Sequence, residues 1–149
     1  MGDTLRKIAI GCDHAGYKYK ELLKNFLESQ SFTVKDFGTV SEDSVDYPDI
    51  IHPLARAVNR DDFRKGIIIC GSGNGVAMVA NKYPNVRAAV CWNDEITRLS
   101  RLHNDANIIA LPARFISREQ ALEFVKIFIS TPFEGGRHSI RVEKISGSL

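Results

Sequence analysis

Cys70 is the residue whose surroundings most strongly suggest chemistry. It ends an apolar run, residues 67–69, and precedes a loop, residues 71–75, with glycine at every second position. Such a loop lets successive backbone N–H groups converge on one point, which makes a site for an anion. A thiolate there suits nucleophilic attack or proton abstraction at carbon. The alternatives are a tight turn without a ligand and a small buried cysteine.

Two histidines elsewhere in the sequence could act together with this loop. His14 follows Asp13 after one apolar run, and His103 with Asn104 precedes another. Histidine is suited to moving protons on hydroxyl oxygens near neutral pH. We expect both histidines on the edge of the sheet that carries Cys70. For His103, a surface position at a helix end is the alternative.

Arg137 and Arg141 form a third group near the end of the chain. Residues four apart share one face of a helix. Two guanidinium groups on one face can bind a phosphate, because each donates several hydrogen bonds in a planar fork. A solvated basic face is the alternative, and the spacing alone does not bring this helix to Cys70.

The same patterns argue against familiar cofactors. The loop GSGNG differs from the dinucleotide-binding pattern GxGxxG, and no Lys-Ser/Thr pair follows its last glycine as in nucleotide-binding P-loops. The histidines and cysteines lack the usual spacing of zinc ligands. We therefore predict a site without a metal or another cofactor.

Short apolar runs alternate with stretches of helical periodicity, which predicts one α/β domain over residues 1–149. Parallel strands with helices on both faces form a three-layer α/β/α sandwich, whose ligands bind at the carboxyl ends of the strands. Ser117 and Gln120 form a capping-box pattern before the fifth helix. The predicted strands cover residues 7–10, 32–37, 67–70, 86–91 and 107–111. The predicted helices cover about 22–27, 50–58, 76–81, 95–102, 121–129 and 141–145.

The composition narrows the class of protein. A net charge of +2 gives no general attraction to nucleic acid or to an anionic membrane. The sequence contains no apolar run long enough to span a bilayer. Residues 1–11 lack the apolar stretch of a secretory signal, so we do not expect a signal peptide there. Three widely spaced cysteines do not form a disulfide framework, so we expect a reducing, cytoplasmic location.

Six ordered blocks in this sequence resemble a known family, the type B ribose-5-phosphate isomerases, which is shared with the galactose-6-phosphate isomerase subunits. The resemblance extends from residue 8 to about residue 145. The blocks are GCDHAG (11–16), SVDYPD (44–49), ICGSGNGVAMVANK (69–82), VRAAVCW (86–92), RLHNDANI (101–108) and GGRHSIRV (135–142).

The resemblance implies a Rossmann-like fold with a five-stranded parallel sheet. It also implies a homo-oligomer, a dimer or a dimer of dimers, with an active site shared between chains. The implied reaction interconverts ribose 5-phosphate and ribulose 5-phosphate in the pentose phosphate pathway and needs no cofactor.

The resemblance also assigns roles to residues. Cys70 is the base that moves a proton between C2 and C1, and His103 opens the furanose ring. Arg137 and Arg141 bind the phosphate, while Arg114 is a further binding residue that the partner chain can supply. The loop binds the enediolate oxygens through Gly71, Ser72, Gly73, Asn74 and Gly75. The other positions that contact or flank the substrate are Asp13, His14, Tyr47 and Asn104.

Departures from the family pattern sharpen these expectations. One branch of the family lacks this cysteine and has Glu directly after GSGNG, where this chain has Val76. The galactose-6-phosphate isomerase subunits divide the site residues between two different chains. Because this chain carries Cys70, His103 and the arginine pair together, we expect a self-sufficient homo-oligomer.

Three other functions remain open from the sequence. The first is isomerisation of a six-carbon sugar phosphate such as allose or galactose 6-phosphate by the same residues. The second is a non-catalytic nucleotide-binding module, which would be indifferent to Cys70. The third is a cysteine hydrolase that uses Cys70 and His103.

Overall fold

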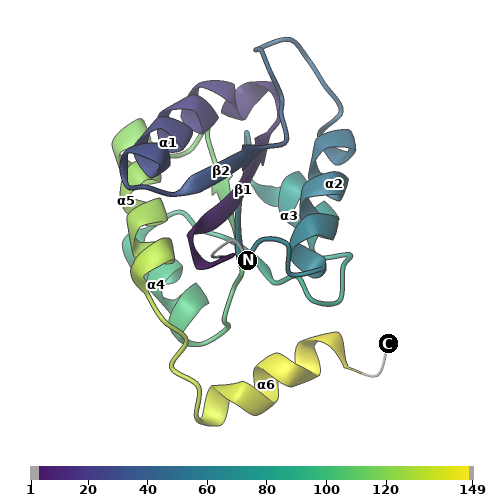
Figure 1. Ribbon diagram of the computed structural model, residues 1–149, viewed down its shortest axis with the longest axis vertical. Coiled ribbons are helices and arrows are strands. Elements are labelled where there is room, and N and C mark those ends of the chain that lie inside the picture. The colour runs from purple at the N-terminus through teal and green to yellow at the C-terminus, as the bar shows by residue number, and fades with distance from the viewer. Residues whose placement is uncertain (1–3, 148–149) are drawn as a thin grey trace.

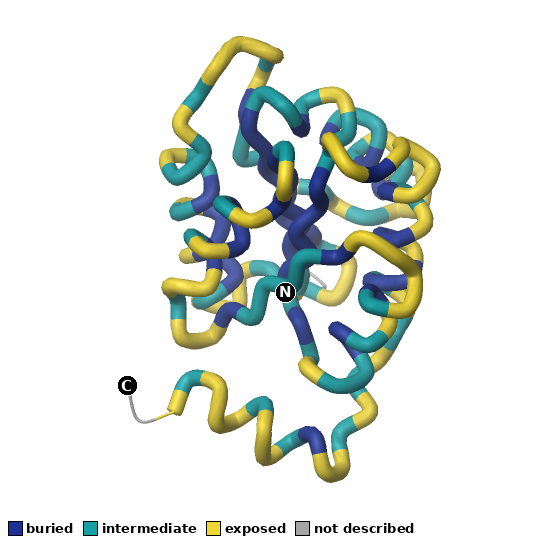
Figure 2. Tube along the Cα trace, turned by 180° about the vertical axis from the view of Figure 1, so that it is seen from behind, coloured by how far each residue is buried: buried dark blue, intermediate teal, exposed yellow. Residues whose placement is uncertain are grey.

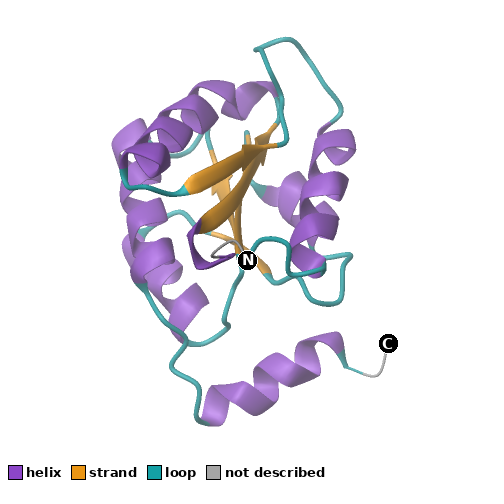
Figure 3. Ribbon diagram, viewed as in Figure 1, coloured by secondary structure: helices purple, strands orange, loops and turns teal. Residues whose placement is uncertain are grey.

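The computed structural model describes residues 4–147 and contains one sheet of five parallel strands (Figure 3). The strand order is β2-β1-β3-β5-β4. The predicted parallel sheet is confirmed, although the fourth strand is shorter than predicted. The strands are β1 (Lys7–Cys12), β2 (Thr33–Asp36), β3 (Lys65–Cys70), β4 (Ala88–Val90) and β5 (Ile108–Pro112).

Helices cover both faces of this sheet, which confirms the three-layer α/β/α architecture (Figure 1). The helices α1, α4 and α5 lie on one face, and α2 and α3 lie on the other. Two short 3₁₀ turns flank β1. The helices are α1 (Tyr17–Ser29), α2 (Tyr47–Asn59), α3 (Asn74–Ala80), α4 (Asp94–Leu102), α5 (Arg118–Ser130) and α6 (Arg137–Ser146).

The central strands are buried on both faces, as expected for a parallel sheet between two helical layers. In β3, Ile67 and Ile69 pack on the side of α1 and α5. Ile68 and Cys70 pack on the side of α2 and α3. Because side chains alternate along a strand, this register directs the Cys70 thiol toward the loop that leads into α3.

Local capping fixes where α5 starts. The Ser117 hydroxyl accepts a hydrogen bond from the Gln120 backbone N–H at 3.1 Å, and the Gln120 side chain accepts one from the Ser117 N–H at 2.8 Å. The predicted capping box is confirmed. Such reciprocal pairs satisfy backbone donors that a helix leaves unpaired at its start.

The helix α6 lies apart from the layers and is largely exposed (Figures 1 and 2). The chain turns into it at Gly135 and Gly136, whose φ angles are +71° and +57°. Its first turn contacts His103, and Ser146 near its end donates a hydrogen bond to the Pro84 carbonyl. Among residues 4–147, no helix has the length and apolar character needed to cross a membrane.

Candidate active site

The strand β3 ends with the Cys70 thiol beside a backbone donor. The Sγ atom accepts a hydrogen bond from the Gly73 N–H at 3.2 Å, and the residue is only 5% exposed. Gly73 has a φ of +76°, a conformation that glycine adopts without steric penalty. The glycine pattern therefore produces a turn that directs an N–H group at the sulfur.

Further hydrogen bonds hold loop 71–75 in place. The Ser72 hydroxyl accepts from the Asn74 N–H at 3.2 Å. The Arg114 N–H, which follows β5, donates to the Gly71 carbonyl at 3.0 Å. The backbone of the loop is therefore fixed both by contacts within the loop and by the segment that follows β5.

A pocket of about 480 Å³ opens beside Cys70. A Cβ atom on Gly75 would lie 2.7 Å from the Tyr47 hydroxyl oxygen, so glycine is needed for the phenol to lie against the loop. The Arg114 side chain packs in the same way on Gly71, since a Cβ there would lie 3.1 Å from Arg114 Cδ. The lining residues are Asp13, Tyr47, Cys70, Gly71, Ser72, Gly75, Arg114 and Phe115.

Asp13 and His14 follow β1, which is the neighbour of β3 in the sheet. The Asp13 carboxylate accepts hydrogen bonds from the N–H groups of Ala15 at 2.9 Å and Gly16 at 3.1 Å, which fixes its position. The Nδ1 atom of His14 is buried and has no hydrogen-bond partner among the described residues.

The position of these residues in the sheet is also informative. The connection from β1 leads to β2 on one side, and the connection from β3 leads to β4 on the other. Open α/β sheets bind ligands at such a reversal, outside the carboxyl ends of the strands. We call this group the Cys70 cluster; it consists of Asp13, His14, Tyr47, Cys70, Gly71, Ser72, Gly73, Asn74, Gly75 and Arg114.

The remaining predicted residues lie at the opposite edge of the sheet. His103 follows the last residue of α4, and Asn104 lines a pocket with Ala88, the first residue of β4. Arg137 and Arg141 are exposed on α6, where the Arg141 Nη1 donates to the Arg137 carbonyl at 2.9 Å. We call this group the His103 cluster; it consists of His103, Asn104, Glu134, Arg137, His138 and Arg141.

The prediction that His103 and Asn104 share an edge with Cys70 is therefore wrong within one chain. The helix α4 starts beyond the carboxyl end of β4 and returns the chain to the amino end of β5. Any residue between α4 and β5 must lie at the amino edge. Arg114, which the resemblance left open to either chain, lines the pocket beside Cys70 of its own chain.

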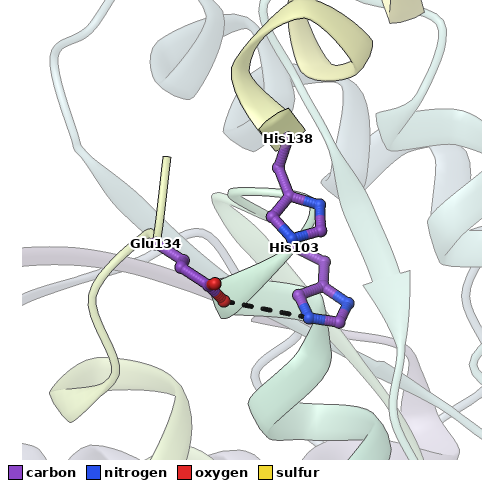
Figure 4. A group of neighbouring side chains, drawn as sticks. All are labelled: His103, Glu134 and His138. Atoms are coloured by element: carbon purple, nitrogen blue, oxygen red, sulfur yellow. Dashed lines mark ion pairs between the residues drawn. The ribbon is translucent and has the colours of Figure 1, made fainter. Parts of the chain in front are cut away.

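The sequence did not reveal the neighbours of His103. Its Nε2 lies 3.9 Å from a Glu134 carboxylate oxygen, and its ring stacks on His138 with centroids 4.2 Å apart (Figure 4). Partial burial lowers the pKa of His138, and the adjacent His103 and Arg137 lower it further. Phe115 in the Cys70 pocket was also missed, because a single exposed aromatic residue in a loop follows no periodic pattern.

The other two cysteines are part of the core, as predicted. Cys12 and Cys91 are both fully buried. Burial raises the pKa of the Cys12 thiol to about 12, and burial also raises the pKa of Cys91. Cys70 differs from both because it borders a pocket and contacts a loop donor.

Comparison with known proteins connects this geometry to a family. The profile of the Ribose/Galactose Isomerase family matches residues 8–145. The chain belongs to this family. Ribose-5-phosphate isomerase B from Escherichia coli is 39% identical over 142 residues, which cover 95% of each chain.

Solved structures of family members have the same fold. Ribose-5-phosphate isomerase B from Clostridium thermocellum is 47% identical, with a TM-score of 0.92 over 94% of this chain and 95% of that one. The Mycoplasma genitalium enzyme, solved with bound ribulose-5-phosphate, is 37% identical, with a TM-score of 0.91 over 94% of this chain and 93% of that one. The Rossmann-like fold implied by the sequence blocks is thereby confirmed.

Proposed function

We propose that this chain interconverts ribose 5-phosphate and ribulose 5-phosphate, in the cytoplasm, as a step of the pentose phosphate pathway. One observation carries the proposal: a Cys70 sulfur that borders a pocket and accepts a hydrogen bond from the Gly73 N–H. The ribulose-5-phosphate bound to the Mycoplasma genitalium relative supports a five-carbon substrate. Three free cysteines are compatible with a reducing compartment.

In this proposal, the thiolate of Cys70 removes the proton from C2 and returns it to C1. The intermediate is an enediolate whose negative oxygens meet the N–H groups of loop 71–75, with the Ser72 hydroxyl nearby. Each well-placed donor of this kind contributes about 3 kcal/mol to transition-state stabilisation. Asp13, His14, Tyr47 and Arg114 orient the sugar.

His103 opens the furanose ring with Asn104 beside it, and Arg137 and Arg141 bind the phosphate. We further propose that these residues act on the Cys70 cluster of a partner chain in a homodimer, alone or within a dimer of dimers. Two features support this arrangement. The two clusters lie at opposite edges of one chain, and α6 extends away from the layers with both arginines exposed.

The first experiment measures turnover in chelator-treated protein. We expect ribose 5-phosphate to be converted into ribulose 5-phosphate, and allose 6-phosphate to be converted much more slowly. Faster turnover of allose 6-phosphate would contradict the pentose assignment. Turnover of neither sugar would refute the proposed reaction.

A second experiment tests the shared site by complementation. Cys70→Ser and His103→Asn are each expected to form inactive homodimers. Random mixing of the two chains by co-expression makes about half of the dimers heterodimers, each with one intact site, which restores about a quarter of wild-type activity. If both clusters served a site in the same chain, mixing would restore nothing.

A further inference from the structure

Three side chains in the His103 cluster could together bind a metal ion. His103 follows α4, Glu134 lies between α5 and α6, and His138 lies in the first turn of α6. One donor atom from each residue lies within 4.8 Å of the other two. Sequence patterns did not reveal this group, because 31 residues separate His103 from Glu134, far more than the short spacings of common zinc motifs.

His138 supplies an independent observation. The residue is 8% exposed, and its Nε2 has no hydrogen-bond partner among the described residues. Buried polar atoms are nearly always paired, so an unpaired ring nitrogen calls for an explanation. Figure 4 shows a ring nitrogen of His138 directed toward His103 and the Glu134 carboxylate. A cation between these groups would satisfy it.

The chemistry of the three donors selects the kind of ion. Two imidazoles and one carboxylate are the ligand set of many catalytic zinc sites, which leave a fourth position open. Tetrahedral zinc with bonds of about 2.0–2.1 Å holds its ligands about 3.4 Å apart, so donors that lie within 4.8 Å must close by at most about 1.4 Å. The stacked imidazoles must also rotate so that both lone pairs point at the ion. The Glu134 side chain is 57% exposed and lies in a connecting segment, which allows the carboxylate to follow.

The surrounding charges set the strength of binding. Arg137 and Arg141 also lie near His138, and their positive charges repel a metal ion bound there. Both side chains are exposed, so solvent screens this repulsion. We therefore expect the two arginines to weaken metal binding without preventing it.

We propose that His103, Glu134 and His138 form a binding site for a divalent transition-metal ion such as Zn²⁺, and that the bound ion inhibits the enzyme. Inhibition follows because coordination occupies the imidazole lone pair with which His103 would act on the sugar ring. This second part rests on the proposed isomerase function, whereas metal binding does not.

Binding is tested without substrate, on full-length chelator-treated protein, by calorimetric titration with Zn²⁺ and by the absorption spectrum of bound Co²⁺. We expect one ion per chain. Glu134→Gln and His138→Asn should each weaken binding at least tenfold. Glu143→Gln, which removes an exposed carboxylate from α6, is the matched control and should bind as the wild type does. Circular dichroism establishes that each variant is folded.

Two results would overturn the metal site. One is the absence of saturable binding to wild-type protein. The other is unchanged binding in Glu134→Gln and His138→Asn with loss in Cys70→Ser, which would place the ion on the thiol.

Inhibition is measured as the ratio of activities with and without Zn²⁺ within each variant. This ratio should fall in wild-type protein, recover with chelator, and stay near one in Glu134→Gln. Saturated binding with undiminished turnover would refute the inhibitory role. Protein that binds Zn²⁺ but never turns over ribose 5-phosphate would refute the proposed function and leave the binding result standing.

Discussion

The Cys70 cluster and the His103 cluster are built in different ways. The first lies at the ends of buried central strands, where hydrogen bonds from the backbone N–H groups of Gly73, Asn74 and Arg114 hold loop 71–75. The second lies between α4 and an outlying helix, and its arginines are exposed. The comparison teaches that the groups proposed to move protons at carbon are fixed by the sheet. The groups proposed to bind the phosphate depend on where α6 docks.

The largest expected effect on activity comes from a change in the Cys70 cluster. Cys70→Ser should lower kcat by about 10³-fold with little change in KM, because a hydroxyl is a far weaker base than a thiolate. Steady-state kinetics on ribose 5-phosphate measure both constants. Cys91→Ala, which removes a buried thiol outside the pocket, is the control and should retain its kcat. Near-normal kcat in Cys70→Ser would remove Cys70 from the mechanism.

A backbone change in the same cluster should have the next largest effect. Gly73→Ala forces a side chain into a backbone with φ of +76°, and its Cβ would lie 3.2 Å from Val90 Cγ1. Displacing the Gly73 N–H should lower kcat/KM by about 10²-fold, the typical loss for one donor of this kind. Gly147→Ala, at a φ of +58° beyond α6, is the matched control. Equal losses in both variants would point to general destabilisation.

A change in the His103 cluster should act on binding more than on chemistry. Arg137→Ala should raise KM about tenfold or more, because a charge-assisted phosphate contact is lost, while kcat changes less. Lys144→Ala removes another exposed cation from α6 and should leave KM unchanged. A KM that rises equally little in both variants would mean that Arg137 faces only solvent, and the contrast between the two clusters would fail.

The smallest effect concerns how α6 docks. The pKa of His138 is lower in the folded protein than its usual value, so the unfolded chain binds the proton more tightly. Stability is therefore fully present above about pH 6.5 and falls as the pH decreases below it. Thermal unfolding at about pH 7.5 and 5.5 should show a smaller pH effect in His138→Asn than in wild type. An identical pH effect in wild type and in His138→Asn would mean that protonation of His138 does not affect the docking of α6.

Much of the fold and of the Cys70 cluster was predictable from local patterns. The apolar run before Cys70 predicts β3, and Ser117 with Gln120 predicts the start of α5, because both signals depend on near neighbours in the chain. Strand–helix alternation then requires parallel strands. Residues at the carboxyl ends of neighbouring strands, such as Asp13 after β1 and Cys70 at the end of β3, must meet at one edge of such a sheet.

Only the tertiary structure decided which side chains lie together across long separations. His103 precedes β5 and therefore lies at the edge of the sheet away from Cys70, because parallel strands place the start of β5 at the opposite edge from the end of β3. The prediction from sequence grouped the two residues by their chemistry. The stacking of His103 on His138 and the nearby Glu134 depend on the path between α5 and α6. That path turns at Gly135 and Gly136, whose positive φ angles set the direction of α6, and no periodic pattern in the sequence specifies such a direction.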